Sequence, residues 1–290
     1  MTKKPPQYLV MAAVLLTSSS SIFIRLSIMP PLVIAFYRMA ISAAFIAVPL
    51  IYRKSRLSTI SRRDLLLCVL SGLALALHFA TWTASLSMTS VMASTVLVTC
   101  SPIFVSIMNA AFFRKRPGKT LLLCLGTAFA GTMIITIGAN GEDGLATLPG
   151  NLLALAGAVF ISFYLIIGQE VRKRVSTAEY SFLAYGAAAV ILLVLCITLA
   201  QPLAPYNLGQ FVNIAAMAVV CSVGGHTLYN MLLKYHGAFL VSLATLCEPF
   251  FASILAAIIL SEIPRIQTAF GGVLVIAGLA VYIAKNRGDQ

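Results

Sequence analysis

One carboxylate lies deep inside an apolar segment of the chain. Glu248 is the only Asp, Glu, Lys or Arg between Lys234 and Glu262, and Pro249 follows it directly. A charge at the centre of a bilayer costs ~2.5–3.5 kcal/mol on insertion scales, so such a residue faces the protein interior or a hydrated cavity. We predict that Glu248 contacts a cationic substrate group or carries a coupling proton. The alternative is a structural acceptor for backbone N–H groups beside Pro249.

Two pairs of aromatic and imidazole side chains accompany this carboxylate. His78 precedes the single tryptophan, Trp82, by four residues, and His226 precedes Tyr229 by three. Such spacings place both members of a pair on one helix face. An aromatic face binds an organic cation or stacks on an aromatic substrate. We therefore predict that all four line a substrate site. The alternatives are a headgroup-depth position for Trp82 and histidines that only bond to neighbouring helices.

An internal repeat explains why these pairs recur. Residues 91–117 and 238–264 match at an offset of 147, with these identities: Cys100/Cys247, Pro102/Pro249, Phe104/Phe251, Ser106/Ser253, Ile107/Ile254, Ala110/Ala257 and Pro117/Pro264. Trp82 and Tyr229 are separated by the same offset. Pro102 and Pro249 each remove a backbone hydrogen bond, and irregular backbone at membrane depth needs protein or a cavity around it. Both prolines are predicted to kink interior helices. A kink that serves packing alone is an equal alternative.

The composition predicts an all-α integral membrane protein. The 290 residues are 60% apolar and 10% charged, with a mean hydropathy of +0.98, which excludes a soluble domain. Because a crossing needs ~20 apolar residues, we predict ten transmembrane helices: 8–28, 32–52, 64–85, 91–113, 119–138, 150–169, 180–200, 208–232, 239–260 and 266–284. A polar break divides the chain into 1–140 and 141–290. Five crossings in each half make the two repeats inverted.

The basic residues predict the orientation. With the N-terminus in the cytoplasm, the cytoplasmic segments hold 17 of the 20 Lys and Arg residues, as the positive-inside rule requires. The outer loops hold Glu142, Asp143, Glu262 and Arg265. Both termini are therefore predicted to be cytoplasmic, and the net charge of +12 reflects topology rather than nucleic-acid binding. Arg25 and Arg38, near helix ends, are expected to extend to the membrane surface. Alternatively, Arg38 binds an anionic substrate group.

The chain lacks the common motifs of nucleotide-hydrolysing, metal-binding and hydrolytic proteins. It has no GxxxxGK[ST] loop, no HExxH, no GxSxG and no CxxC. We therefore expect no ATP hydrolysis, no metal site, no cofactor and no enzyme activity. An ion or substrate gradient must drive any transport, and protons are the candidate coupling ion. Glycines in the last helix of each half, among them Gly126 and Gly272, favour close helix packing, either between these helices or in a homodimer.

The residues just described resemble those of a known family. The segments 78–91, 94–98 and 101–105 resemble the first half of EamA-type proteins of the drug/metabolite transporter superfamily, and the segments 248–252 and 260–262 resemble the second half. The resemblance implies two inverted five-helix halves and a central cavity lined mainly by helices 1, 3, 4, 6, 8 and 9. One departure is Arg114-Lys115-Arg116, where family members often carry a Gly-Glu-Arg-like turn.

The resemblance also implies secondary transport. Similar proteins export amino acids and drugs, or take up choline-like and nucleoside-like metabolites. We therefore expect a secondary active transporter of the bacterial inner (plasma) membrane that moves a small organic metabolite by alternating access. One buried acid and several aromatic rings favour an amino-acid-like, cationic or zwitterionic substrate, with drug-like molecules as a further class. The alternative is an antiporter that exchanges an anionic metabolite by means of Arg38. A channel and an intramembrane enzyme are less favoured.

Overall fold

The structure is a computed structural model that describes residues 8–52, 54–55, 57–112, 123, 126–127, 130–131, 134 and 147–286. Every regular element in these ranges is a helix. In the first half the elements are α1 (Tyr8–Ser18), α2 (Ser20–Arg25), α3 (Pro31–Tyr52), η1 (Leu57–Thr59), α4 (Arg62–Ser85), α5 (Val91–Val98) and α6 (Ser101–Phe112). The second half contains α8 (Leu148–Val171), α9 (Thr177–Thr198), α10 (Leu208–Met217), η2 (Ala218–His226), α11 (Thr227–Ala244), η3 (Thr245–Cys247), α12 (Glu248–Ile259) and α13 (Ile266–Asn286).

Seven helical segments of the described chain are long and apolar enough to cross a membrane. One of them, 208–259, is 52 residues long and contains both the eighth and the ninth predicted crossing. The chain turns within it at Gly237, where φ is +74°, a conformation that a side chain disfavours. The fifth predicted crossing, 119–138, lies outside the described residues apart from isolated positions. The count of ten therefore remains a prediction.

Serine caps set where several helices begin. Ser61, Ser90 and Ser176 each have extended backbone, and each side chain accepts a hydrogen bond from the amide three residues later. This bond satisfies one of the free N–H groups that open a helix. Glu179 completes a capping box with Ser176 at the start of α9. The serines between the apolar runs thus determine the residue at which α4, α5 and α9 begin.

The two repeat prolines lie at matching helix breaks. The sequence predicted them inside continuous helices, but α5 ends at Val98 and α6 begins at Ser101, so Pro102 is the second residue of a new segment. Likewise, η3 separates α11 from α12, and Pro249 is the second residue of α12. A first turn needs no intrahelical donor, so proline is tolerated there. Both copies of the repeat therefore break at the same place.

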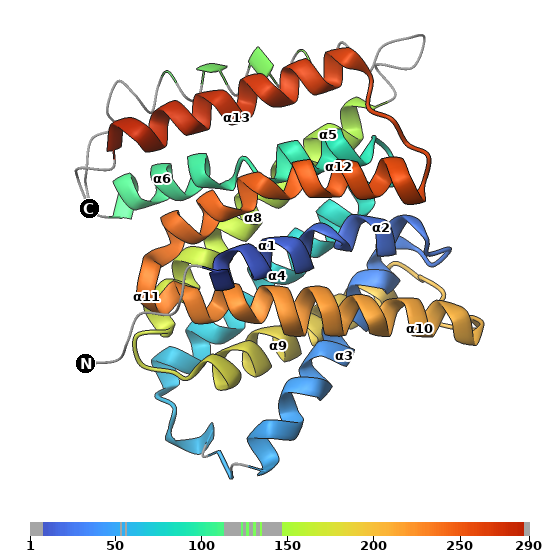
Figure 1. The fold of residues 1–290 in the computed structure, drawn as a ribbon. Helices are drawn as coiled ribbons and strands as arrows, with labels where there is room; N and C mark the ends of the chain where they lie inside the picture. The colour runs from blue at the N-terminus through green and yellow to red at the C-terminus, as the bar shows by residue number, and fades with distance from the viewer. Residues whose placement is uncertain are drawn as a thin grey trace.

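The surface and the interior have the polarity of a membrane protein. Outward-facing side chains include Ile51, Val190 and Ile258, which are 63% exposed or more, whereas Ser71, Ser181 and Asn230 are completely buried. Small residues allow close helix contact: a Cβ on Gly72 of α4 would lie 2.7 Å from the Ala184 carbonyl oxygen of α9. The helix α4, from the first half, packs mainly on α8 and α9 of the second (Figure 1). The halves are thus interleaved, and a polar interior lies between them.

Candidate functional site

A cavity lies between the two halves. Its walls come from α1, α2, α4, the α5–α6 junction, α8, η2, α11, η3 and α12, and consist of Thr17, Ser20, His78, Trp82, Val98, Thr99, Ser101, Ile161, Tyr164, Leu165, His226, Tyr229, Val241, Thr245 and Glu248. These segments belong to the first, third, fourth, sixth, eighth and ninth predicted crossings. All five predicted binding residues face this one space.

Glu248 joins the two halves of the protein. Its Oε1 accepts hydrogen bonds from Thr17 Oγ1 of α1 at 2.7 Å and from the Tyr229 hydroxyl of α11 at 2.8 Å. Among the described residues, its Oε2 has no hydrogen-bond partner. These partners are side-chain hydroxyls, whereas the structural alternative requires backbone amides. As the first residue of α12, it also lies where the helix dipole favours negative charge.

His78 and Trp82 form one wall of the cavity. Their rings are stacked, with centroids 5.9 Å apart and planes at 12°. His78 Nδ1 lies 2.9 Å from the Gly157 carbonyl oxygen; a carbonyl only accepts, so Nδ1 carries the hydrogen and Nε2 of the neutral ring is an acceptor. Trp82 is 6% exposed, so its ring lies inside the helix bundle rather than on the outer surface. Within the described structure its Nε1–H is buried without a hydrogen-bond partner.

His226 and Tyr229 form the opposite pair through an unusual piece of helix. His226 ends η2, a π-helix of nine residues, and its ring meets Tyr229 edge-on at 6.1 Å. A Cβ on Gly225 would lie 2.5 Å from Thr17 Cγ2, so only glycine allows α1 this close. The wide turn and the glycine together bring Thr17 to the Tyr229–Glu248 pair. π-helical turns are frequent at functional sites.

The repeat offset would have located cavity residues that the sequence analysis missed. Thr17 and Tyr164 are separated by 147 residues and both line the cavity. The same offset relates three further pairs in its walls, which are Trp82/Tyr229, Val98/Thr245 and Ser101/Glu248. Hydroxyl groups in apolar helices attract little notice on their own. Comparison of the copies position by position is the signal that could have found Thr17 and Tyr164.

Arg38 does not extend to the membrane surface, and that expectation was wrong. The residue is 1% exposed. Its Nε donates to Ser222 Oγ and its Nη1 donates to Ser20 Oγ, each at 2.8 Å. The guanidinium carbon lies 4.1 Å from the centre of the Phe79 ring. Two hydroxyl acceptors and an aromatic face stabilise the buried cation, so this charge has partners that hydropathy alone does not reveal.

An ion pair joins the halves beyond one end of α4. Arg25 Nη2 lies 2.9 Å from Glu262 Oε2, and Glu262 Oε1 accepts from the Val91 amide at 2.6 Å. The Arg25 side chain is 32% exposed, so it reaches the surface as expected but is held by an acid of the second half. One carboxylate thus connects the end of α2, the start of α5 and the loop after α12.

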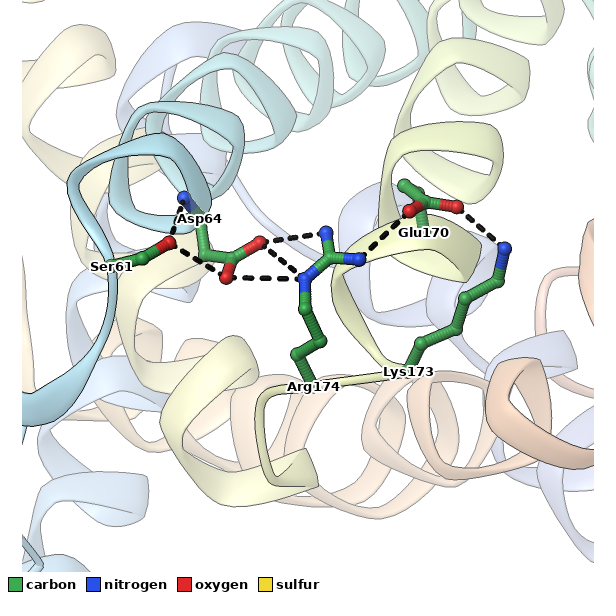
Figure 2. A network of polar contacts seen from close by, with 5 residues as sticks. All are labelled: Ser61, Asp64, Glu170, Lys173 and Arg174. Carbon is green, nitrogen blue, oxygen red and sulfur yellow. Dashed lines mark hydrogen bonds and ion pairs between the residues drawn. The ribbon is translucent and has the colours of Figure 1, made fainter.

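A second network joins the halves at the other end of α4. Arg174, between α8 and α9, donates to both oxygens of Asp64 at 2.8–3.2 Å and to Glu170 Oε1 at 2.9 Å. Figure 2 shows the guanidinium between the two carboxylates, with Ser61 on Asp64 and Lys173 on Glu170. The pKa of the Arg174 guanidinium is raised, mainly by its hydrogen bonds to Asp64 and next by the one to Glu170. The network therefore keeps its charges throughout the physiological pH range.

Comparisons with known proteins agree with one another. The sequence model of the EamA-like transporter family matches residues 5–137 and again residues 148–284. An uncharacterized transporter of Archaeoglobus fulgidus is 23% identical over 278 residues, which cover 94% of this chain and 95% of the relative. The uncharacterized transporter YxxF of Bacillus subtilis is 22% identical over 79% of this chain and 73% of its own length. A crystal structure with 17% sequence identity superimposes with a TM-score of 0.70 over 98% of each chain, which shows a shared fold.

Proposed function

Because the chain belongs to the EamA-like transporter family and is a multi-pass membrane protein, we propose that it is a secondary active transporter of a small organic metabolite. The observation that carries the proposal is the carboxylate of Glu248, held by one hydroxyl from each half inside an aromatic-lined cavity. Such a group binds a substrate cation and senses the relative position of the halves. The two halves then rock around this site to expose it to each side in turn.

The cavity chemistry favours a substrate with a positively charged group. Glu248 is the only acid among the lining residues, and its Oε2 is available to a ligand. Trp82, Tyr164 and Tyr229 add aromatic surface, which attracts ammonium groups and stacks on planar ones. An amino-acid-like, cationic or drug-like metabolite fits this combination. His78 and His226 supply polar edges to the same walls.

The proposed transporter has ten transmembrane helices in two inverted repeats, 1–140 and 141–290. Three observations support this arrangement: the double family match, the repeat-related pairs in the cavity, and the position of 17 of the 20 basic residues in segments that would be cytoplasmic. Both termini then lie in the cytoplasm, and the membrane is the bacterial inner membrane.

The two ion-pair networks support alternating access. Asp64 begins α4 and Val91 follows its end, and 24 residues of helix span roughly 36 Å. The Asp64–Arg174 and Arg25–Glu262 pairs therefore lie on opposite sides of the cavity, and each joins the first half to the second. Opening the cavity to either side requires one pair to separate. Protons are the proposed coupling ion, with Glu248 as their carrier.

The test is uptake of labelled L-phenylalanine and choline, a zwitterion and a cation, into proteoliposomes with and without a pH gradient. Glu248→Gln keeps the shape and removes the charge, so we expect uptake to fall at least about tenfold, because a buried charge partner of the substrate is lost, and its dependence on the pH gradient to disappear. Glu142→Gln, in a predicted outer loop, is the matched control and should transport normally. Unchanged, pH-dependent uptake by Glu248→Gln contradicts the proposal.

One observation favours a second candidate, an antiporter of an anionic metabolite. Arg38 is a fully buried cation that has one unpaired nitrogen within the described structure. Vesicles preloaded with an organic anion distinguish the two functions. An exchanger takes up external anion only when internal anion is present, whereas proton-coupled transport proceeds from empty vesicles.

A further inference from the structure

We propose that Arg38 makes the cavity select substrates without net charge, so that it rejects simple cations in favour of zwitterions. The inference rests on the proposed function and narrows its substrate class. Arg38 is not among the cavity-lining residues. It acts from one layer behind the wall, as a fixed positive charge that opposes the fixed negative charge of Glu248.

The first observation concerns two buried hydrogen-bond donors, on two different side chains, that lack acceptors among the described residues. In the part of the chain that the structure describes, Arg38 Nη2 and Trp82 Nε1 are both buried and lack hydrogen-bond partners. An unsatisfied buried donor costs ~1–3 kcal/mol, and more when it is charged. Trp82 lines the cavity, so an acceptor oxygen of a ligand can satisfy its N–H. A substrate that carries an acidic group supplies such an oxygen; a simple amine does not.

The second observation is the position of Arg38 relative to the carboxylate. Its Nη1 donates to Ser20 Oγ, and Ser20 lines the cavity. Thr17, three residues earlier on the same helical stretch, donates to Glu248. Residues three apart share a helix face. The two opposite charges therefore contact neighbouring hydroxyls of one surface, so that the cavity has a negative and a positive side.

Charge balance follows from this arrangement. Without substrate, Arg38 and an ionised Glu248 sum to zero. A bound monocation leaves one net positive charge in a low-dielectric interior, where charge–charge energies are several times those in water. A zwitterion leaves none: its ammonium group faces Glu248 while its acidic group lies in the positive potential of Arg38 and beside Trp82. The neutral combination is the less costly one inside a membrane.

A purely structural role explains less of what is observed. Ser222 accepts from Nε, Ser20 accepts from Nη1, and Phe79 packs on the flat face of the guanidinium. Those contacts would anchor α2, α4 and η2 to α3, yet among the described residues they leave Nη2 buried without a hydrogen-bond partner. If anchoring were the only role, replacement of Arg38 would weaken all ligands alike. If Arg38 selects by charge, replacement changes the ratio between ligands that differ only in charge.

The experiment uses matched ligands on the purified full chain. One set is L-phenylalanine, phenethylamine and 3-phenylpropionate; the other is glycine betaine and choline. Affinities come from ligand-induced shifts in melting temperature and from competition for uptake. In the wild type we expect each zwitterion to bind at least about tenfold more tightly than its matched cation. Arg38→Gln should reduce that ratio about tenfold, since the opposing charge is gone.

Two variants separate charge from shape. Arg38→Lys keeps the charge and loses the guanidinium fork, and it should retain the zwitterion preference. Arg63→Gln removes an exposed arginine at the start of α4 and should leave the ratio unchanged. The wild-type order of affinities tests the proposal even if an Arg38 variant does not fold.

Several outcomes overturn the inference. A wild-type preference for phenethylamine and choline contradicts it and leaves the proposed transport of cations intact. A preference for 3-phenylpropionate contradicts it and supports the anion exchanger. A ratio that Arg38→Gln does not change also contradicts it. Failure of both ligand sets to bind contradicts the inference and the proposed function together.

Discussion

At the scale of single residues, some side chains in and around the cavity could be predicted from the sequence and others could not. Glu248 and Trp82 could be predicted because a charge or a lone indole in an apolar run needs a reason, and Tyr229 because it lies 147 residues after Trp82. Arg38 was misplaced, because its burial depends on Ser20, Ser222 and Phe79, which come from other elements. The depth of a long basic side chain is decided by partners in space, and these cannot be inferred from position along a helix.

Two substitutions of Trp82 distinguish the contribution of its aromatic ring to ligand binding from that of its indole N–H. Trp82→Ala should weaken binding of the aromatic ligands at least about tenfold, because ring contacts and buried apolar area are both lost. Trp82→Phe keeps a ring face and should lose less, with the loss concentrated on ligands that carry an acceptor oxygen. The concentration dependence of uptake measures both. Unaltered affinity in Trp82→Ala would assign this side chain to packing alone.

At the scale of elements, caps and prolines could be predicted better than irregular helix. Ser61, Ser90 and Ser176 are ordinary start signals, and the prolines marked real breaks. The π-helix η2 could not be predicted from the sequence, because nothing along the chain shows that Gly225 lies directly against Thr17 of α1. The turn at Gly237 within the segment 208–259 likewise depends on a single backbone angle.

Gly225→Ala tests whether η2 must let α1 approach. The added Cβ would meet Thr17 Cγ2 at 2.5 Å and the Thr17 amide nitrogen at 3.2 Å, so α1 must move. Overpacking of this kind typically costs about 1–3 kcal/mol, and the movement should weaken the Thr17–Glu248 bond. We expect a lower melting temperature and reduced uptake. The control is Gly186→Ala, where a Cβ meets no atom within 4 Å; equal effects of the two variants would contradict the idea.

At the scale of the whole molecule, we propose that the ion pairs at the two ends of α4 control which side of the cavity opens. Composition and loop charge were enough to predict a membrane bundle, and the repeat was enough to predict two related halves. Neither could predict the ion pairs between the halves, because no motif or spacing in the sequence relates Asp64 to Arg174. Such pairs arise only once the halves are packed together.

Charge reversal tests the network of Asp64 and Arg174. Asp64→Arg places like charges beside Arg174 and should favour the state open at this end, while Asp64→Arg combined with Arg174→Asp restores the pair. Because Arg174 is 41% exposed, we expect a shift of only a few-fold. The measurement is the labelling rate of a cysteine introduced at cavity residue Thr99, in a background without native cysteines, with a membrane-impermeant reagent. Equal rates in the single and double variants would contradict the assignment.

Orientation is tested by accessibility in intact cells. Cysteines placed after Arg114 and beside Glu262 should react from opposite sides of the membrane, because inverted halves place equivalent helix ends on opposite faces. The first should be protected from an impermeant reagent and the second should react. Protection or reaction of both together would refute the inverted arrangement.

The pairing of Ser101 with Glu248 across the repeat has a further consequence. Duplicated halves that were chemically equal would give a carrier whose inward and outward forms have matching energies. Here one wall bears an acid where the other bears a hydroxyl, so the two forms stabilise a bound ammonium group unequally. Half-saturation from the two faces of the membrane should then occur at different concentrations, and the protein would work as a rectifier whose preferred direction is set by which copy carries the acid.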